Sequence, residues 1–157
     1  MRIRDILLEK GTNVVTIDSG QSIHDAITRL GENRIGALIV TTEDEEVAGI
    51  LTERDILRTC GERCGSANDS SVPGENVCSS PVQEAMTTDL ITGIPDDDPN
   101  YVLAVMTKNR IRHLPILDDG SLAGIISIGD LVNAHLEEQV IKSGTLKDYI
   151  SRNKPAN

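Results

Sequence analysis

The sequence predicts an α+β fold built from two similar halves, and three observations support this. Residues 49–57 (GILTERDIL) are repeated in character by residues 124–132 (GIISIGDLV), which lie 75 positions later. The tripeptide Asn33-Arg34-Ile35 recurs as Asn109-Arg110-Ile111, 76 positions later. Around these landmarks both halves have the order strand, helix, strand, strand, helix. A repeat of this length indicates a duplicated structural unit.

Each copy of the repeated stretch predicts a short buried strand that runs directly into a helix. Thr52 and Ser127 are suitable N-caps, because a hydroxyl oxygen can accept a backbone N–H of the first helical turn. Asp55 and Asp130 follow three residues later, where the helix dipole favours a negative charge. A strand end that faces exposed helix amides can also bind an anion. The sequence therefore predicts two equivalent corners.

The first half contains four further predicted elements before the strand that leads into the first corner. Apolar spacing predicts an N-terminal helix with Ile3, Ile6 and Leu7 on its buried face, ended by Gly11. A strand is expected at 14–17. A helix capped by Ser22 follows, with a buried side formed by Ile23, Ala26, Ile27 and Leu30, and it ends at Gly31 or Asn33. The aliphatic run 37–40 predicts a strand covered on both faces, and 47–51 predicts its hairpin partner.

The second half follows the same order after a polar stretch at 61–80, rich in Gly, Ser, Asn, Asp and Pro, which reads as a linker. We expect a short helix opened by Pro81, a strand at 90–92, a helix at 101–109 and a hairpin formed by 114–117 and 122–126. A helix from Ser127 to about Gln139 closes the half, and 146–150 could add a turn. The predicted organisation is a first repeat with N-terminal helix at 1–66, a flexible linker at 67–80, a second repeat at 81–140 and a C-terminal tail at 141–157.

Composition favours a soluble globular protein and argues against several partners. The 157 residues are 38% hydrophobic and 25% charged, with a net charge of −10 and only 1% aromatic residues. An acidic chain with few aromatics is a poor match for nucleic acid, which requires a basic surface. No apolar run approaches the length of a membrane span, and the first residues do not resemble a signal peptide. We therefore expect a cytoplasmic protein that binds neither nucleic acid nor membrane.

Catalytic and metal-binding patterns were not found in the sequence. Cys60, Cys64 and Cys78 are an odd number in one stretch without a neighbouring histidine, so a four-ligand zinc site is not predicted. Free thiols in a reducing compartment are the favoured interpretation, and a redox role is the alternative. No nucleophile–base pair, P-loop or metal-ligand spacing occurs. The prediction is a protein that is not an enzyme and has no metal.

The paired G-h-h-[ST]-x-x-D segments (h, hydrophobic), in matching frames, resemble those of tandem cystathionine-β-synthase (CBS) domain proteins. The resemblance covers about residues 11–135, and the phrases RIGALIV and RIRHLPIL fit small stand-alone members. It implies two repeats related by a pseudo-two-fold axis, with two clefts that bind AMP, ADP, ATP, S-adenosylmethionine or, in some members, NAD(H). It also implies a homodimer and an unknown protein target that reads a ligand-dependent change in conformation.

The resemblance further implies which residues contact the nucleotide. Asp55 and Asp130 match the aspartate that takes the ribose hydroxyls, which suits a carboxylate because it only accepts hydrogen bonds. Thr52 and Ser127 match the hydroxyl residue near ribose or phosphate. The segments before each first strand would contact adenine, and the middle strands would line the clefts. The full predicted set is Thr12, Val15, Gly36, Ala37, Thr52, Arg54, Asp55, Ile91, Arg112, His113, Ser127 and Asp130.

The two predicted sites are not equal in charge, and simpler explanations exist. Arg112 and His113 stand where the first repeat has Gly36 and Ala37, so we expect the two clefts to differ in affinity. The guanidinium of Arg112 suits a phosphate. The Thr/Ser–Asp pairs could also act only as helix caps, each worth about 1 kcal/mol. The alternatives to nucleotide sensing are a structural dimerisation module and a thiol-linked redox regulator.

Overall fold

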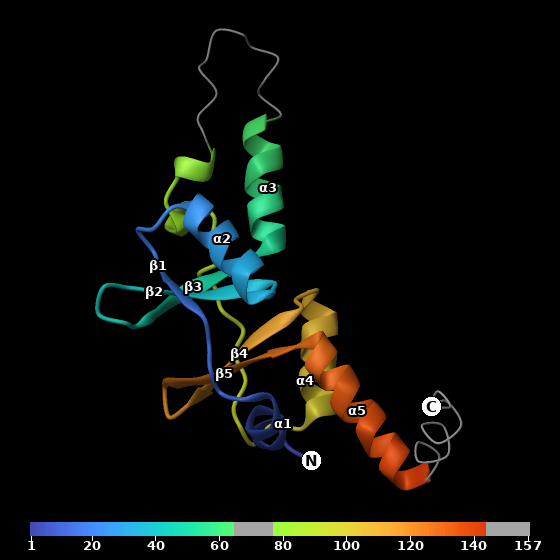
Figure 1. Cartoon of the computed structure of the whole chain (residues 1–157). Helices are drawn as coiled ribbons and strands as arrows, with labels where there is room; N and C mark the ends of the chain where they lie inside the picture. Colours follow the sequence, from blue (N-terminus) through green and yellow to red (C-terminus); the bar gives the residue numbers. More distant parts are fainter. Residues whose placement is uncertain (65–76, 144–157) are drawn as a thin grey trace, which may run out of the picture. The chain divides into compact units, whose positions relative to one another are not determined.

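The computed structural model describes residues 1–64 and 77–143, which form two compact units (Figure 1). The first-repeat unit comprises Asn13–Ile91, and the second-repeat unit joins Met1–Thr12 to the chain from Thr92 onward. Both units combine helices with a small sheet, which confirms the α+β class and the two repeats. The boundaries expected at 66, 80 and 140 stay predictions.

The first-repeat unit contains a three-stranded sheet covered by helices. Its elements are β1 (Thr16–Asp18), α2 (Ile23–Asn33), β2 (Ala37–Thr41), β3 (Val47–Thr52) and α3 (Glu53–Cys64). Strand β2 lies centrally, parallel to β1 and antiparallel to β3. Residues Ala37 to Val40 are all buried, as expected for a continuous aliphatic strand.

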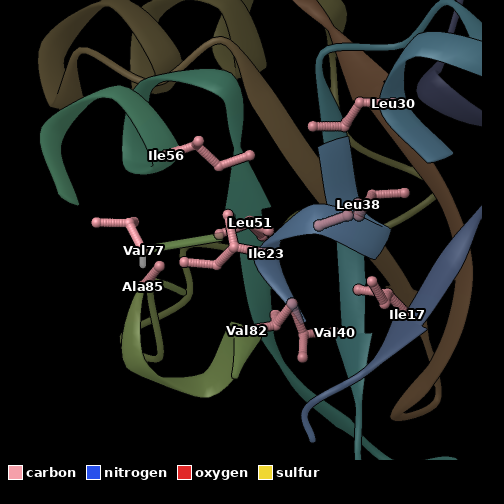
Figure 2. Close-up of a cluster of buried hydrophobic side chains, with 11 residues drawn as sticks. Ile17, Ile23, Leu30, Leu38, Val40, Leu51, Ile56, Val77, Val82 and Ala85 are labelled. Carbon is pink, nitrogen blue, oxygen red and sulfur yellow. The ribbon is translucent and has the colours of Figure 1, made fainter. Parts of the chain in front are cut away.

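Figure 2 shows how the core of this unit draws on segments on both sides of the undescribed stretch. Strand and helix residues meet Val77, Val82 and Ala85, which follow that stretch. Val77 belongs to the short 3-10 helix η1 (Val77–Ser79), Val82 to η2 (Val82–Glu84), and Ala85 is the C-cap of η2. The buried members of the cluster are Ile17, Ile23, Ala26, Leu30, Leu38, Val40, Leu51, Ile56, Val77, Val82 and Ala85.

Several local predictions for the first-repeat unit were wrong in detail. Ile27 is 42% exposed, so the buried stripe of α2 is narrower than its spacing suggested. Part of the polar stretch 61–80 is structured, because α3 continues to Cys64 and η1 begins at Val77. Pro81 is the N-cap of η2, outside the helix that it was expected to open. Each miss reflects tertiary packing that local composition does not record.

The second-repeat unit has a two-stranded sheet with helices around it. Its elements are α4 (Pro99–Asn109), β4 (His113–Asp118), β5 (Ser121–Ser127) and α5 (Ile128–Ser143), together with α1 (Ile3–Lys10). The strand predicted at 90–92 is wrong: the structure has one parallel bridge there, between Gly93 and Ile116. This bridge corresponds to the pair Ile17–Val40 of the first repeat. The turn expected at 146–150 lies outside the described residues.

Helix α1 packs in the second-repeat unit although it opens the first repeat in sequence. Ile3, Ile6 and Leu7 are buried, as predicted, and α1 contacts β5 and α5. The buried cluster of this unit contains Ile3, Ile6, Leu7, Val102, Met106, Leu114, Ile116, Ile126, Leu131 and Ala134. The opening segment of each repeat, residues 1–12 and residues 77–91, therefore packs in the unit that contains the rest of the other repeat, and these two stretches are the exchanged segments.

This exchange explains the glycine that opens each repeated stretch. A Cβ atom on Gly49 would lie 2.7 Å from the carbonyl oxygen of Thr87, and a Cβ on Gly124 would lie 2.6 Å from Cδ2 of Leu7. Both distances are shorter than a normal van der Waals contact. A side chain at Gly49 would therefore require the backbone of Thr87 to move, whereas a side chain at Gly124 would require only the end of the Leu7 side chain to move.

Candidate functional site

The first corner lies at the junction of β3 and α3, where Asp55 closes a capping box with Thr52. The backbone N–H and the hydroxyl of Thr52 donate to Oδ2 of Asp55 at 2.9 and 2.7 Å. The backbone N–H of Asp55 donates back to the Thr52 hydroxyl at 3.3 Å. This reciprocal arrangement satisfies donors that a helix start otherwise leaves open. The predicted cap is therefore confirmed.

The other oxygen of Asp55 also has partners. Arg58 donates to Oδ1 at 3.0 Å, and the hydroxyl of Thr87 donates to the same oxygen at 3.3 Å. Thr87 belongs to the exchanged segment 77–91, so this segment completes the first corner. The Asp55 side chain is only 8% exposed. A buried carboxylate with four donors is firmly held in place.

The second corner, at the junction of β5 and α5, repeats the capping box but differs in its third partner. The backbone N–H and the hydroxyl of Ser127 both donate to Oδ2 of Asp130 at 2.7 Å. Lys10, at the end of α1, donates to the same oxygen at 2.5 Å and to the carbonyl of Ile125 at 3.1 Å. The exchanged segment again completes the corner, here with a charge.

The second corner is more open and its electrostatics are shaped by Lys10. The Asp130 side chain is 21% exposed and that of Lys10 is 34% exposed. Burial by itself would raise the pKa of Asp130, but hydrogen bonds from Lys10 and Ser127 outweigh it and hold the pKa below its usual value of 3.8. The carboxylate is therefore ionised at neutral pH.

The start of each middle strand lies beside its corner, as the predicted site requires. In the first-repeat unit Ala37 pairs with Thr52, and the carbonyl of Gly36 accepts the N–H of Glu53 at 3.2 Å. In the second-repeat unit His113 pairs with Ser127, and the carbonyl of Arg112 accepts the N–H of Ile128 at 3.0 Å.

The structure sorts the remaining predicted residues between the two units. Thr12 lies in the second-repeat unit, two positions after Lys10, and is exposed. Val15, Arg54 and Ile91 lie in the first-repeat unit, where Arg54 and Ile91 are exposed and Val15 packs against the core cluster. Arg112, in the second-repeat unit, is also exposed.

Three residues that contact the corners were missing from the predicted site: Lys10, Arg58 and Thr87. Arg58 could have been found, because it stands three residues after Asp55 on the same helix. Lys10 and Asp130 are 120 residues apart, and no local pattern links them. Their pairing follows from the packing of α1 in the second-repeat unit.

A hollow of about 260 Å³ lies next to the second corner within the second-repeat unit. Asp130 and Lys10 line it together with Ile6, Glu9, Asn133, Ala134 and Glu137. Among the side chains of residues 1–63 and 77–139, no group of three or more His, Cys, Asp or Glu could hold a metal ion. In the part of the chain that the structure describes, neither Cys60 nor Cys78 is in a disulfide.

The duplicated corner stands in two matching frames, β-α-β-β-α in the first repeat and α-β-β-α with one additional bridge in the second, and these define a two-repeat α+β module. The sequence profile of the CBS domain matches residues 3–62 and 82–137, so both repeats are covered. The chain therefore belongs to the CBS domain family. The CBS domain-containing protein CBSX3, mitochondrial, of Arabidopsis thaliana is 32% identical over 156 residues, which span 94% of this chain and 71% of the relative.

Solved structures have the same fold. A CBS-domain containing protein from Agrobacterium tumefaciens is 36% identical, with a TM-score of 0.76 over 85% of this chain and 92% of its own. The CBS domain pair of the protein MJ0100, in complex with 5′-methylthioadenosine and S-adenosyl-L-methionine, is 24% identical with a TM-score of 0.71. Its match covers 88% of this chain and 98% of that one, and it shows a common fold.

Proposed function

We propose that this protein is a regulatory, non-catalytic module that binds an adenosine-containing nucleotide through its two corners. AMP, ADP, ATP and NAD(H) are the candidate ligands. The observation that carries the proposal is the duplicated carboxylate corner, in which Asp55 and Asp130 stand at a helix start beside the first residues of a middle strand. The complex of the MJ0100 domain pair with two adenosine compounds supports this ligand class.

The chemistry of each corner suits a ribose and a phosphate. A carboxylate can accept both hydroxyl groups of a cis-diol, and the adjacent helix start favours negative charge. Arg112 at the second corner is exposed and would supply a phosphate contact, whereas the first repeat has Gly36 at that position. We therefore propose that nucleoside phosphates prefer the corner of Asp130.

Signalling would follow from a shift between conformations. A ligand can shift such an equilibrium only by its difference in affinity for the two states. Each corner is completed by an exchanged segment from the other repeat. A ligand that binds at a corner would therefore contact residues of both repeats. An unknown protein target would read the change. Within the described residues no helix has the length and apolarity of a membrane span, and we propose a cytoplasmic location.

A ligand panel tests the proposal directly. Thermal unfolding would be followed with adenosine, AMP, ADP, ATP, NADH and S-adenosylmethionine, with GTP and inorganic phosphate as controls. A ligand at 100 times its dissociation constant stabilises the folded state by about 2.7 kcal/mol, which raises the melting temperature by several degrees. If none of the adenosine compounds shifts the melting temperature at millimolar concentration, the proposed function is wrong.

Exposed apolar side chains favour a second role, self-association. Leu57 on α3 is 71% exposed, and Val132 and Leu136 on α5 are 44% and 56% exposed. Val132 and Leu136 are four residues apart and therefore lie on one face of the helix. We propose that these helices contribute to a homodimer. Light scattering that gives a mass of 17.0 kDa at all concentrations would contradict this.

A further inference from the structure

The Asp130 carboxylate has one crowded oxygen. Oδ2 receives three hydrogen bonds, from the N–H and the hydroxyl of Ser127 and from the ammonium of Lys10, at 2.7, 2.7 and 2.5 Å. A carboxylate oxygen has two lone pairs, and three donors already share them here, so a further donor has no good site on Oδ2. A cis-diol that donates to both oxygens of Asp130 must therefore displace a donor from Oδ2.

Lys10 is the donor that can leave. The two Ser127 bonds belong to the capping box, and losing them would open the start of α5. Lys10 comes from another helix, is 34% exposed at its side chain and reaches Asp130 through a flexible stem. Its ammonium can be rehydrated without disturbing α1, which is anchored by the buried Ile3 and Leu7.

We propose that Lys10 is a latch that occupies Asp130 in the ligand-free protein and must be released before the ribose of a nucleotide can bind there. This inference rests on the proposed function, because it concerns regulation of the same site. The latch sets the affinity of the second corner and couples its occupancy to the end of α1.

The hollow beside the corner offers the released ammonium new partners. Glu9, Asn133 and Glu137, whose side chains carry acceptor oxygens, are among its lining residues. An ammonium that leaves Asp130 in this hollow remains among acceptors, so release does not strand a charge in an apolar environment. The exchange of partners keeps the latch weak enough to be opened by a small ligand.

Calorimetric titration of Lys10→Met with adenosine tests the latch. Methionine keeps the apolar stem and removes the charge, and adenosine presents the ribose without a phosphate. We expect Lys10→Met to bind adenosine about two- to five-fold more tightly than the parent, the size that a partly exposed ion pair allows. Lys10→Arg should behave like the parent, because the charge is retained. Equal or weaker binding by Lys10→Met would overturn the latch.

Arg4→Met provides a matched control on the same helix. Arg4 forms an ion pair with Asp96 at 2.5 Å, with side chains 52% and 67% exposed. The substitution removes the same charge from α1 away from the corner, so adenosine affinity should not change. If Arg4→Met tightens binding as much as Lys10→Met does, net charge explains the effect and the latch is wrong.

A measurement without ligand separates this inference from the proposed function. NMR titration of the Asp130 carboxyl should give a higher pKa in Lys10→Met than in the parent, because the ammonium is lost. An unchanged pKa would show that Lys10 does not hold Asp130 in solution and would overturn the latch. If the pKa rises but neither protein binds any adenosine compound, the proposed function fails and the latch fails with it. If both bind equally, only the latch fails.

Discussion

The two corners have the same capping box but are closed by different chemistry. At the first corner Asp55 is nearly buried and meets the neutral hydroxyl of Thr87 and the guanidinium of Arg58. At the second corner Asp130 is more exposed and meets the ammonium of Lys10. Duplication preserved the local motif, while the exchanged segments supply a neutral hydroxyl at the first corner and an ammonium at the second.

The comparison separates two roles that one motif can have. Asp55 has two donors on each oxygen and is nearly buried, so a ligand there would displace several bonds, and we expect its larger effect to be on stability. Asp130 is more exposed and its Lys10 partner comes from another helix, so we expect the ligand to prefer this corner. Substitutions at the motif glycines and at the two aspartates would test this difference between the corners.

Alanine at the two motif glycines should reveal how tightly each exchanged segment is held. In Gly49→Ala the new Cβ meets a backbone oxygen, which cannot move aside, and we expect a loss of about 3 kcal/mol in the free energy of unfolding. In Gly124→Ala it meets the end of the Leu7 side chain, which can rotate, so the loss should be about 1 kcal/mol. Chemical denaturation measures both. Equal losses would contradict the difference in packing.

Asp130→Ala should weaken nucleotide binding by about 1.5–3 kcal/mol, the range for a hydrogen bond to a charged group. The reason is that Asp130 is the accessible carboxylate, so the ribose contact is expected there. Calorimetry with AMP, ATP and NADH measures the loss. Unchanged affinity for all three, together with a modest fall in melting temperature, would mean that Asp130 is only a helix cap.

Asp55→Ala should affect stability more than Asp130→Ala does. Loss of the buried carboxylate removes the cap of α3 and the partners of Arg58 and Thr87, so we expect a cost of about 2 kcal/mol. The corresponding cost at Asp130 should be about 1 kcal/mol. Denaturant unfolding of both variants gives the comparison. A larger loss for Asp130→Ala would reverse the roles assigned to the two corners.

The smallest effect concerns acid. Because the pKa of Asp130 is lower in the folded protein than its usual 3.8, its contribution to stability is complete above that pH and is lost as the pH falls through the folded-state pKa. In Lys10→Met this loss should be smaller, by less than about 1 kcal/mol, since the pair is partly exposed. Unfolding between pH 6 and pH 2.5 measures it. Parallel curves for parent and variant would contradict the pairing.

The duplication, most helices and strands and both corner motifs could be predicted from the pattern of residues alone. These features depend on residues close together in the chain: Ser127 and Asp130 are three positions apart, and residues 37–40 form a continuous aliphatic run. Short-range spacing fixes which side chains meet at a helix start, so caps can be predicted without knowledge of the fold. The candidate carboxylates were therefore identifiable from the sequence.

The unit in which each exchanged segment packs depends on tertiary contacts and could not be predicted from the sequence. The apolar face of α1 requires burial, but its pattern does not say against what, and either repeat offers an apolar surface. Once α1 packs on β5 and α5, Lys10 reaches Asp130 and Leu7 requires Gly124. The same reasoning applies to Thr87 at Asp55 and Gly49. Contacts between residues far apart in sequence depend on this choice, and no local pattern encodes it.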